Sequence, residues 1–545
     1  MKIAESTAPL AARSRKRTLL LLLLAGAVLR IFISAGTAGH LYDSNTFFAW
    51  ATQLAEVGPE GFYAPDYFGD YPPGYMLVLW GAGVLIRFFR LEAGSAAANI
   101  LLSAMPIACD LAIAALLYRL AKEPLGERGA ALLAGIMALH PTMIFDSAVW
   151  KQVDSVLTLA LLLCFYAIMR HMYPTAAFFY ALALLIKPQA LLFGPVFALC
   201  YLLPIVFSEN RKAFGKSVLN ALLSLLTCLV VLAGVSLLFQ GDQTPIVWLV
   251  EKYTTTTGSY PYATVNAFNL FALLGGNWVA QDELLWCLSW KQWGTLGILL
   301  VTLLLIWFAL RAYRARSTRF SPFLLCGFYC CGIFTLGQNM HERYLIPGIV
   351  FLFAAFATLR DRRLLRVASV FSGTCLANMV LVFVSIGGDE FLQSATSVLI
   401  VRLVSALQVL AFGYLLYVSY DILVCGRRAP VREFFHRRHA WTELCRTAVP
   451  RWTKFDTAVI CALTLATAAV SLTYLGDATA PTKALETKGA AASSTVQFPS
   501  GCTIASLWAF PGIGNGTITV TDYKGSSLFS MEIAQGNCFS WCVSS

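Results

Sequence analysis

Four polar side chains interrupt a very apolar part of the sequence at NMHERYLIPG, residues 339–348. They are Asn339, His341, Glu342 and Arg343. An arginine can hold a phosphate through two parallel hydrogen bonds, and a carboxylate can accept a proton from a hydroxyl nucleophile. This segment therefore indicates group-transfer chemistry near an anion, provided that other polar clusters lie on the same side of the protein.

Polar groups gather at four other interruptions of the apolar sequence. Residues 38–75 carry five carboxyl groups and no Lys or Arg, residues 140–155 read HPTMIFDSAVWKQVDS, residues 185–195 read LIKPQALLFGP, and residues 260–275 read YPYATVNAFNLFALLG. The candidate site residues in these segments are Asp43, Asp70, Trp150, Lys151, Gln152, Asp154, Lys187, Gln189, Asn266 and Asn269. Lys187, Arg343 and His341 could stabilise an anionic leaving group.

The elements that must position these residues are membrane helices. Of the 545 residues, 58% are hydrophobic and 13% charged, which indicates an all-α polytopic membrane protein. Thirteen apolar runs could cross the membrane. They are residues 18–36, 97–118, 129–146, 154–170, 175–187, 189–206, 217–239, 294–311, 320–337, 345–359, 365–386, 396–424 and 455–475. The net charge of +11 resides in short basic runs between these segments, without the interleaved aromatic residues of a nucleic-acid site, so we expect no nucleic-acid partner.

The basic runs also orient the helices. With a cytoplasmic N-terminus, almost all Lys and Arg fall in inside loops and every polar segment named above falls outside. We therefore expect a multi-pass protein of the plasma membrane with an extracytoplasmic C-terminus. This orientation requires that residues 71–90, although apolar, lie in the outer interface as a helix opened by Pro72 and Pro73 and anchored by Arg87 and Arg90. The alternative is a true span, with another span lost downstream.

Composition divides the chain into four parts. Residues 1–17 form a basic cytoplasmic N-terminus, residues 18–475 the transmembrane domain, residues 476–496 a small, polar linker and residues 497–545 a small extracytoplasmic β-rich module, either reduced or truncated. CTIASLWAF, GTITVTDY and SSLFSMEIA alternate with the period of strands. Cys502, Cys538 and Cys542 could form one disulfide and would leave one cysteine unpaired.

Each candidate also has a structural interpretation. Asp43 could be a solvated loop residue, and Asp70 could cap the interfacial helix. Asp154 could cap the helix that follows it, and Lys187 could extend to the membrane surface.

Three further interpretations are local. Glu342 and Arg343 could pair only with each other, and the amides of Asn266 and Asn269 could cap loop turns. Asp110 lies inside an apolar run, where a bond to a neighbouring helix is the expected role.

Six segments, in this order along the chain, resemble segments of a known enzyme family: YDSNTFFAWA…GFY…DYPPGY, LLSAMPIACDLAIAALLYRL, HPTMIFDSAVWKQVDS, KPQ, ATVNAFNL and MHERYL. Over residues 18–475 the chain resembles GT-C superfamily glycosyltransferases, which use polyprenyl-phosphate sugars. The similar enzymes are glycosylphosphatidylinositol mannosyltransferase, dolichyl-phosphate-glucose glucosyltransferases and a prokaryotic branch grouped with protein O-mannosyltransferases. One departure is Lys151, which stands where the usual motif is Trp-Gly-Gln.

The resemblance implies a GT-C fold and an inverting transfer. A hexose such as mannose would move from a polyprenyl-phosphate donor in the outer leaflet to a hydroxyl of a glycan, lipid or protein acceptor. Asp43 would be the catalytic base. The donor phosphate would contact Lys187, Arg343, His341 and Lys151. The substrate or acceptor pocket would include Asp70, Trp150, Gln152, Asp154, Gln189, Asn266, Asn269 and Glu342.

This chemistry requires no cofactor, because cationic side chains are already present. The first outer loop contains no DxD triplet, so the sequence gives no support for a divalent metal. The rival function is a transporter or flippase of lipid-linked sugars. A transporter is expected to carry charged residues near the bilayer midplane and an internal repeat, and the sequence places its polar groups at one face instead. A scaffold that anchors the β-rich tail would need none of these carboxylates.

Overall fold

The computed structural model describes residues 8–64, 67, 69–241, 243–257, 260–315, 320–385 and 395–429, together with four C-terminal strands. The chain divides into two compact units. The first unit comprises Met1–Phe62, Asp70–Val380 and Leu399–Arg451, and it holds the candidate site. The second comprises Tyr63–Gly69, Leu381–Val398 and Trp452–Ser545.

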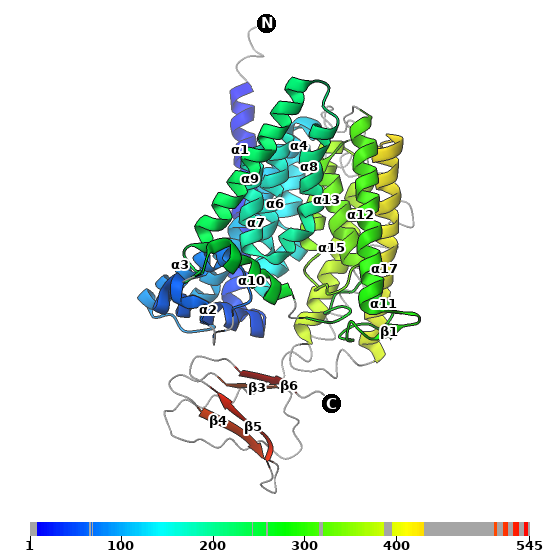
Figure 1. Cartoon of the computed structure of the whole chain (residues 1–545). Coiled ribbons are helices and arrows are strands. Elements are labelled where there is room, and N and C mark those ends of the chain that lie inside the picture. The colour runs from blue at the N-terminus through cyan, green and yellow to red at the C-terminus, as the bar shows by residue number, and fades with distance from the viewer. Residues whose placement is uncertain are drawn as a thin grey trace. The chain divides into compact units, whose positions relative to one another are not determined.

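The N-terminal half of the helical part consists of long helices (Figure 1), with short helical segments between them at two places. Its elements are α1 (Ala8–Gly36), α2 (Leu41–Phe62), α3 (Pro73–Phe89), α4 (Ala96–Ala138), α5 (Pro141–Ile144), the π-helix η1 (Phe145–Trp150), α6 (Asp154–Met169), α7 (Tyr173–Ile186), the 3₁₀ helix η2 (Pro188–Phe193), α8 (Gly194–Val206) and α9 (Arg211–Ser236).

The C-terminal half continues with helices and one short hairpin. Its elements are α10 (Pro245–Thr257), α11 (Leu270–Leu273), β1 (Leu284–Leu285), β2 (Leu288–Ser289), α12 (Trp290–Arg314), α13 (Pro322–Leu336), α14 (Ile346–Leu359), α15 (Arg362–Val384), α17 (Ala395–Tyr420) and the π-helix η3 (Asp421–Cys425).

Seven helical segments among the described residues are long and apolar enough to cross a membrane. They are Arg17–Gly36, Ala96–Trp150, Pro188–Val206, Arg211–Ser236, Trp290–Arg314, Arg362–Val384 and Ser397–Cys425, and five shorter apolar helices lie among them. The prediction of a mainly helical, multi-pass membrane protein is confirmed. The number of thirteen spans stays a prediction, and the predicted span 455–475 lies outside the described residues.

The helix α4 turns back on itself at Gly126, whose φ of 69° and ψ of 171° are not helical. Contacts with α1 show the reversal. Arg30 reaches both Asp110 in the first arm and the carbonyl of Ala138 in the second. The predicted run 97–118 therefore lies on the first arm, and the run 129–146 begins on the second arm and continues through α5 into η1. The bond predicted for Asp110 is formed.

The predicted interfacial segment 71–90 is a helix, α3, which begins at Pro73 and packs against α2. A Cβ at Gly83 would lie 1.7 Å from the carbonyl oxygen of Ala51, so only glycine permits this close approach. Figure 1 shows α2 and α3 together at the end of the helical part opposite the start of α1. Their depth in a bilayer stays a prediction.

Strands are present in the C-terminal part of the chain, as the alternating pattern predicts. β3 (Ser506–Ala509) pairs antiparallel with β6 (Phe539–Cys542), and β4 (Gly516–Thr521) pairs antiparallel with β5 (Ser527–Ile533). The fourth strand, β6, was not predicted. The linker 476–496, Cys502 and Cys538 lie outside the described residues.

Candidate functional site

A cavity of about 380 Å³ collects polar residues from segments that are far apart in the sequence. Six predicted site residues line it: Asp43, Asp70, Lys187, Gln189, His341 and Arg343. They come from the start of α2, the segment before α3, the junction of α7 and η2, and the segment before α14. Tyr71, Tyr260, Asn339 and Tyr344 complete the polar lining, and Pro188, Leu191, Leu192 and Met340 supply its apolar part.

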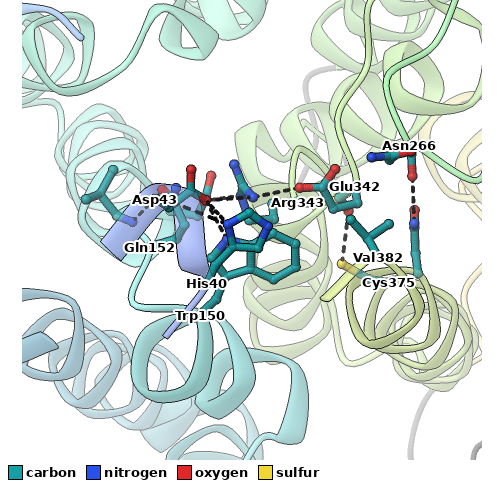
Figure 2. Close-up of polar contacts among 12 residues, drawn as sticks. His40, Asp43, Trp150, Gln152, Asn266, Glu342, Arg343, Cys375 and Val382 are labelled. Carbon is teal, nitrogen blue, oxygen red and sulfur yellow. Dashed lines mark hydrogen bonds and ion pairs between the residues drawn. The ribbon is translucent and has the colours of Figure 1, made fainter. Parts of the chain in front are cut away.

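Arg343 is the charge centre of this site. Its Nη1 lies 2.6 Å from Oε1 of Glu342 and 3.4 Å from Oδ2 of Asp43, and its Nε lies 3.6 Å from Oδ2 of Asp154. Figure 2 shows the guanidinium between Asp43 and Glu342. Burial alone would lower the pKa of Arg343, but the three carboxylates raise it, so the side chain stays cationic at every accessible pH.

Asp43 lies in the first turn of α2 and is surrounded by donors. Its Oδ2 accepts a 2.6 Å hydrogen bond from Nε1 of Trp150 and lies within 3.4 Å of Nη1 of Arg343, and Gln152 also donates to its carboxylate. Burial would raise the pKa of Asp43, but these groups outweigh burial and hold the pKa at about 2. The carboxylate is therefore ionised near neutral pH.

Trp150 is buried, with only 1% of its surface exposed, and it contacts several residues of the site. The ring of His40 stacks on it at a centroid distance of 4.5 Å, and the guanidinium carbon of Arg343 lies 4.6 Å from its centroid. The indole thus fixes Arg343 through a cation–π contact and Asp43 through a hydrogen bond. Trp150 and Gln152 do not line the cavity; they support it.

Lys187 forms the second cationic position. It follows the last residue of α7 in extended conformation, and its Nζ lies 3.0 Å from each carboxylate oxygen of Asp154. Both side chains are almost fully buried, so Lys187 does not extend to the membrane surface. Val153, not Asp154, occupies the N-cap position of α6, which excludes the capping interpretation of Asp154. Glu342 and Asp154 lie behind the cavity lining and balance its two cations.

Asp70 lines the cavity and does not cap α3, whose N-cap residue is Pro72. Burial and the negative charge of Asp43 raise the pKa of Asp70 to about 6, against the opposing effect of Lys252 and Lys187. The site therefore holds two carboxyl groups whose proton affinities differ widely.

The contact of His341 with a donor phosphate stays a prediction, and the imidazole would make that contact without a positive charge. His341 lines the cavity, but burial, Arg343 and Lys187 lower the pKa of its imidazole to about 3. The ring is neutral at physiological pH and packs edge-on against Tyr260 at 5.0 Å. A neutral imidazole can still hydrogen-bond to a ligand.

Lys151 does not line the cavity, so its position does not support the predicted phosphate contact. Lys151 has a φ of 70° and is fully buried, and its Nζ lies 3.2 Å from the carbonyl oxygen of Ser34 and 3.3 Å from Oγ1 of Thr37. The ammonium group therefore neutralises the C-terminal end of α1 instead of facing the cavity. Gly39, at φ +85°, makes room for it, since a Cβ there would lie 2.9 Å from the side chain of Lys151.

The two predicted asparagines have structural roles. Asn269 caps α11 by accepting hydrogen bonds from the backbone of Phe271 and Ala272. Asn266 accepts a 2.8 Å hydrogen bond from the indole of Trp278, and it lies apart from the Asp43 group in Figure 2. Its backbone pairs with His341, so it supports the cavity from behind.

Sequence reasoning missed His40 and Tyr71. Nδ1 of His40 lies 3.5 Å from Oδ2 of Asp43, and burial lowers the pKa of His40 to about 4. Tyr71 donates a hydrogen bond to Gln152 and places its ring 5.5 Å from the ammonium of Lys187. Their only signal was adjacency, because His40 precedes Asp43 by three residues and Tyr71 follows Asp70.

The described residues include no group of three His, Cys, Asp or Glu side chains arranged to hold a metal ion. What the cavity offers is a set of fixed carboxylates, two buried cations and neutral hydrogen-bonding groups. No protein-family model matches the chain, and no curated protein is similar to it by sequence.

Proposed function

We propose that the protein is an inverting glycosyltransferase that moves a hexose from a polyprenyl-phosphate donor to the hydroxyl group of an extracytoplasmic acceptor. The observation that supports this most strongly is that Asp43, Lys187 and Arg343 line one cavity. A base and two cations in one water-accessible space match the needs of a displacement in which a phosphate leaves.

In this proposal, Asp43 takes the proton of the acceptor hydroxyl as its oxygen forms a bond to C1 of the sugar. The bond between C1 and the phosphate oxygen breaks, and polyprenyl phosphate leaves with that electron pair. Arg343 and Lys187 stabilise the charge that develops on the phosphate. Attack opposite to the leaving group inverts the configuration at C1.

Binding of the donor also has a consequence for the base. The contact of Arg343 with Asp43 is long, at 3.4 Å, whereas its contact with Glu342 is short, at 2.6 Å. A phosphate that replaces Asp43 at Nη1 would remove the charge that most lowers the pKa of Asp43. The carboxylate then becomes a stronger base only after the donor has bound, so the donor binds before the acceptor reacts.

The test is release of polyprenyl phosphate by purified protein in lipid nanodiscs. Polyprenyl-phosphate mannose and polyprenyl-phosphate glucose are supplied with a mixture of envelope glycans, lipids and peptides from the native membrane. We expect release with the intact protein and a loss of at least about 100-fold for Asp43→Asn. Glu56→Gln is the matched control, because Glu56 is exposed on the same helix.

A transporter or flippase would move these lipids between leaflets without releasing polyprenyl phosphate. Lipid movement that is unaffected by Asp43→Asn, with no release from either donor, would overturn the transferase proposal. Equal release by Asp43→Asn and Glu56→Gln would remove Asp43 from the catalytic role while leaving the transfer itself in place.

A further inference from the structure

A second polar network lies among the helices next to the cavity and takes no part in the chemistry proposed above. Nε of Arg30 in α1 lies 2.8 Å from Oδ2 of Asp110 in α4, and the side chains are 0% and 1% exposed. The same guanidinium donates to the carbonyl oxygen of Ala138, in the second arm of α4. A buried arginine and a buried aspartate thus join α1 to both arms of α4.

Asp110 also holds two serines beyond α4. Its Oδ2 accepts a 2.7 Å hydrogen bond from Ser147, and its Oδ1 accepts a 2.5 Å hydrogen bond from Ser155. Ser147 lies in η1 and Ser155 lies in the first turn of α6. These two serines flank the turn of Lys151–Val153, so one carboxylate fixes both ends of that turn.

The residues directly before and after this turn, Trp150 and Asp154, support the cavity. Trp150, three residues after Ser147, donates to Asp43, and Asp154, directly before Ser155, holds Lys187. η1 is a π-helix, a form that is rare and frequently found at functional sites. The position of Trp150 and Asp154 therefore depends on what anchors η1 and the start of α6.

We propose that Arg30 and Asp110 form a positioning pair that holds η1 and the first turn of α6, and thereby sets the geometry of Trp150 and Asp154 at the cavity. Arg30 orients the carboxyl group of Asp110 among the helices, and the two oxygens of that group accept hydrogen bonds from both serines. The effect on turnover rests on the proposed transferase function. The positioning of η1 does not.

A pair that only stabilises the fold and a pair that positions η1 would respond differently to replacement of both residues. Replacing both members of a buried ion pair with apolar residues is often neutral for stability, whereas removal of one member leaves a buried charge. The double variant Arg30→Met/Asp110→Leu therefore separates the two roles, because it removes both charges and also the acceptor of Ser147 and Ser155. A pair that only stabilises the fold would be replaced without consequence for η1.

The experiment is amide hydrogen exchange of the full chain in nanodiscs, read over residues 145–155, with thermal unfolding measured in parallel. We expect Asp110→Asn to lower the melting temperature and the double variant to recover most of it. In both variants, exchange over residues 145–155 should rise at least about ten-fold, because Ser147 and Ser155 each lose a hydrogen bond to a charged acceptor. Exchange in α13 should be unchanged.

Arg363→Met is the matched control. Arg363 also holds a buried carboxylate, with Nη2 2.7 Å from Asp361, and its contacts in the described residues lie outside η1 and α6. We expect this variant to unfold at a lower temperature with no change over residues 145–155. If the double variant exchanges like the parent protein over these residues, the positioning proposal is overturned.

Polyprenyl phosphate release adds a second readout. We expect the double variant to lose turnover about ten-fold, because Trp150 and Asp154 would no longer hold Asp43 and Lys187 in position. If the parent protein releases nothing, the transferase proposal fails, and the exchange measurement still decides whether Arg30 and Asp110 position η1.

Discussion

The indole Nε1 of Trp150 donates a 2.6 Å hydrogen bond to Oδ2 of Asp43, across 107 positions of sequence. This bond joins the end of η1 to the start of α2. It holds the carboxylate at the cavity while the face of the same indole contacts Arg343. One buried side chain therefore fixes both the proposed base and one of the cations that would stabilise the leaving group.

Trp150→Phe removes this hydrogen bond and keeps most of the ring packing. A hydrogen bond to a charged group contributes about 1.5–3 kcal/mol, so we expect polyprenyl phosphate release to fall about 10- to 100-fold. Trp293→Phe is the control, because Trp293 donates a comparable 3.0 Å hydrogen bond to the carbonyl of Leu285. Equal activity of the two variants would show that the indole bond to Asp43 has no catalytic importance.

Arg343→Lys tests whether the shape of the guanidinium matters beyond its charge. Lysine keeps one positive charge but has a single nitrogen, whereas Arg343 contacts Glu342 and Asp43 through Nη1 and Asp154 through Nε. We expect the variant to fold and to need at least about ten-fold more donor for half-maximal release. Arg343→Gln removes the cation from Glu342 and Asp43, whereas Asp154 keeps Lys187. Loss of one partner from a buried pair costs about 3–5 kcal/mol.

Thermal unfolding separates these two variants. Arg343→Gln should unfold at a clearly lower temperature than Arg343→Lys. If both bind donor as tightly as the parent protein, Arg343 does not contact the phosphate.

Lys187 and Asp154 form a buried pair that a double-mutant cycle can resolve. We expect Lys187→Met and Asp154→Leu each to destabilise the protein by about 3–5 kcal/mol, and the double variant to recover much of that loss. Activity should stay low in the double variant, because the ammonium is absent. A double variant that is both stable and active would limit Lys187 to a structural role.

The sequence was sufficient to predict that Asp43, Lys187 and Arg343 lie in one site. Charged residues are costly among apolar helices, so they collect at one face, and the distribution of Lys and Arg identifies which loops share that face. The start of α3 at Pro73 was predictable for a related reason, because proline is favoured in the first turn of a helix.

The direction of individual side chains was not predictable. Lys151 lies between Trp150 and Gln152, yet its left-handed backbone turns its ammonium toward α1 and away from the cavity. The charge of His341 depends on burial and on two cations that only the fold brings near. No sequence pattern predicts the left-handed backbone of Lys151, and none predicts the π-helix that precedes it.

Asp70 should make stability depend on pH in a direction opposite to the usual carboxylate. Its pKa is raised from 3.8 to about 6, so the folded protein holds this proton more tightly than the unfolded chain does. The stabilising contribution is full below pH 3.8 and is lost as the pH rises through about 6. We therefore expect Asp70→Asn to unfold at the same temperature as the parent protein near pH 4 and at a higher temperature near pH 7. The gain should be at most about 3 kcal/mol.

Asp43→Asn supplies the contrast, because the pKa of Asp43 is lowered to about 2. Its ionised form stabilises the protein above pH 3.8, and that contribution is lost only as the pH falls toward 2. Near pH 7 we expect this variant to be less stable than the parent protein, since Arg343 loses one of its three carboxylates. Unfolding temperatures of the three proteins at pH 4, 5.5 and 7 give the comparison. An Asp70→Asn variant that gains no stability between pH 4 and pH 7 would show that Asp70 is ionised without cost and that its pKa is not raised.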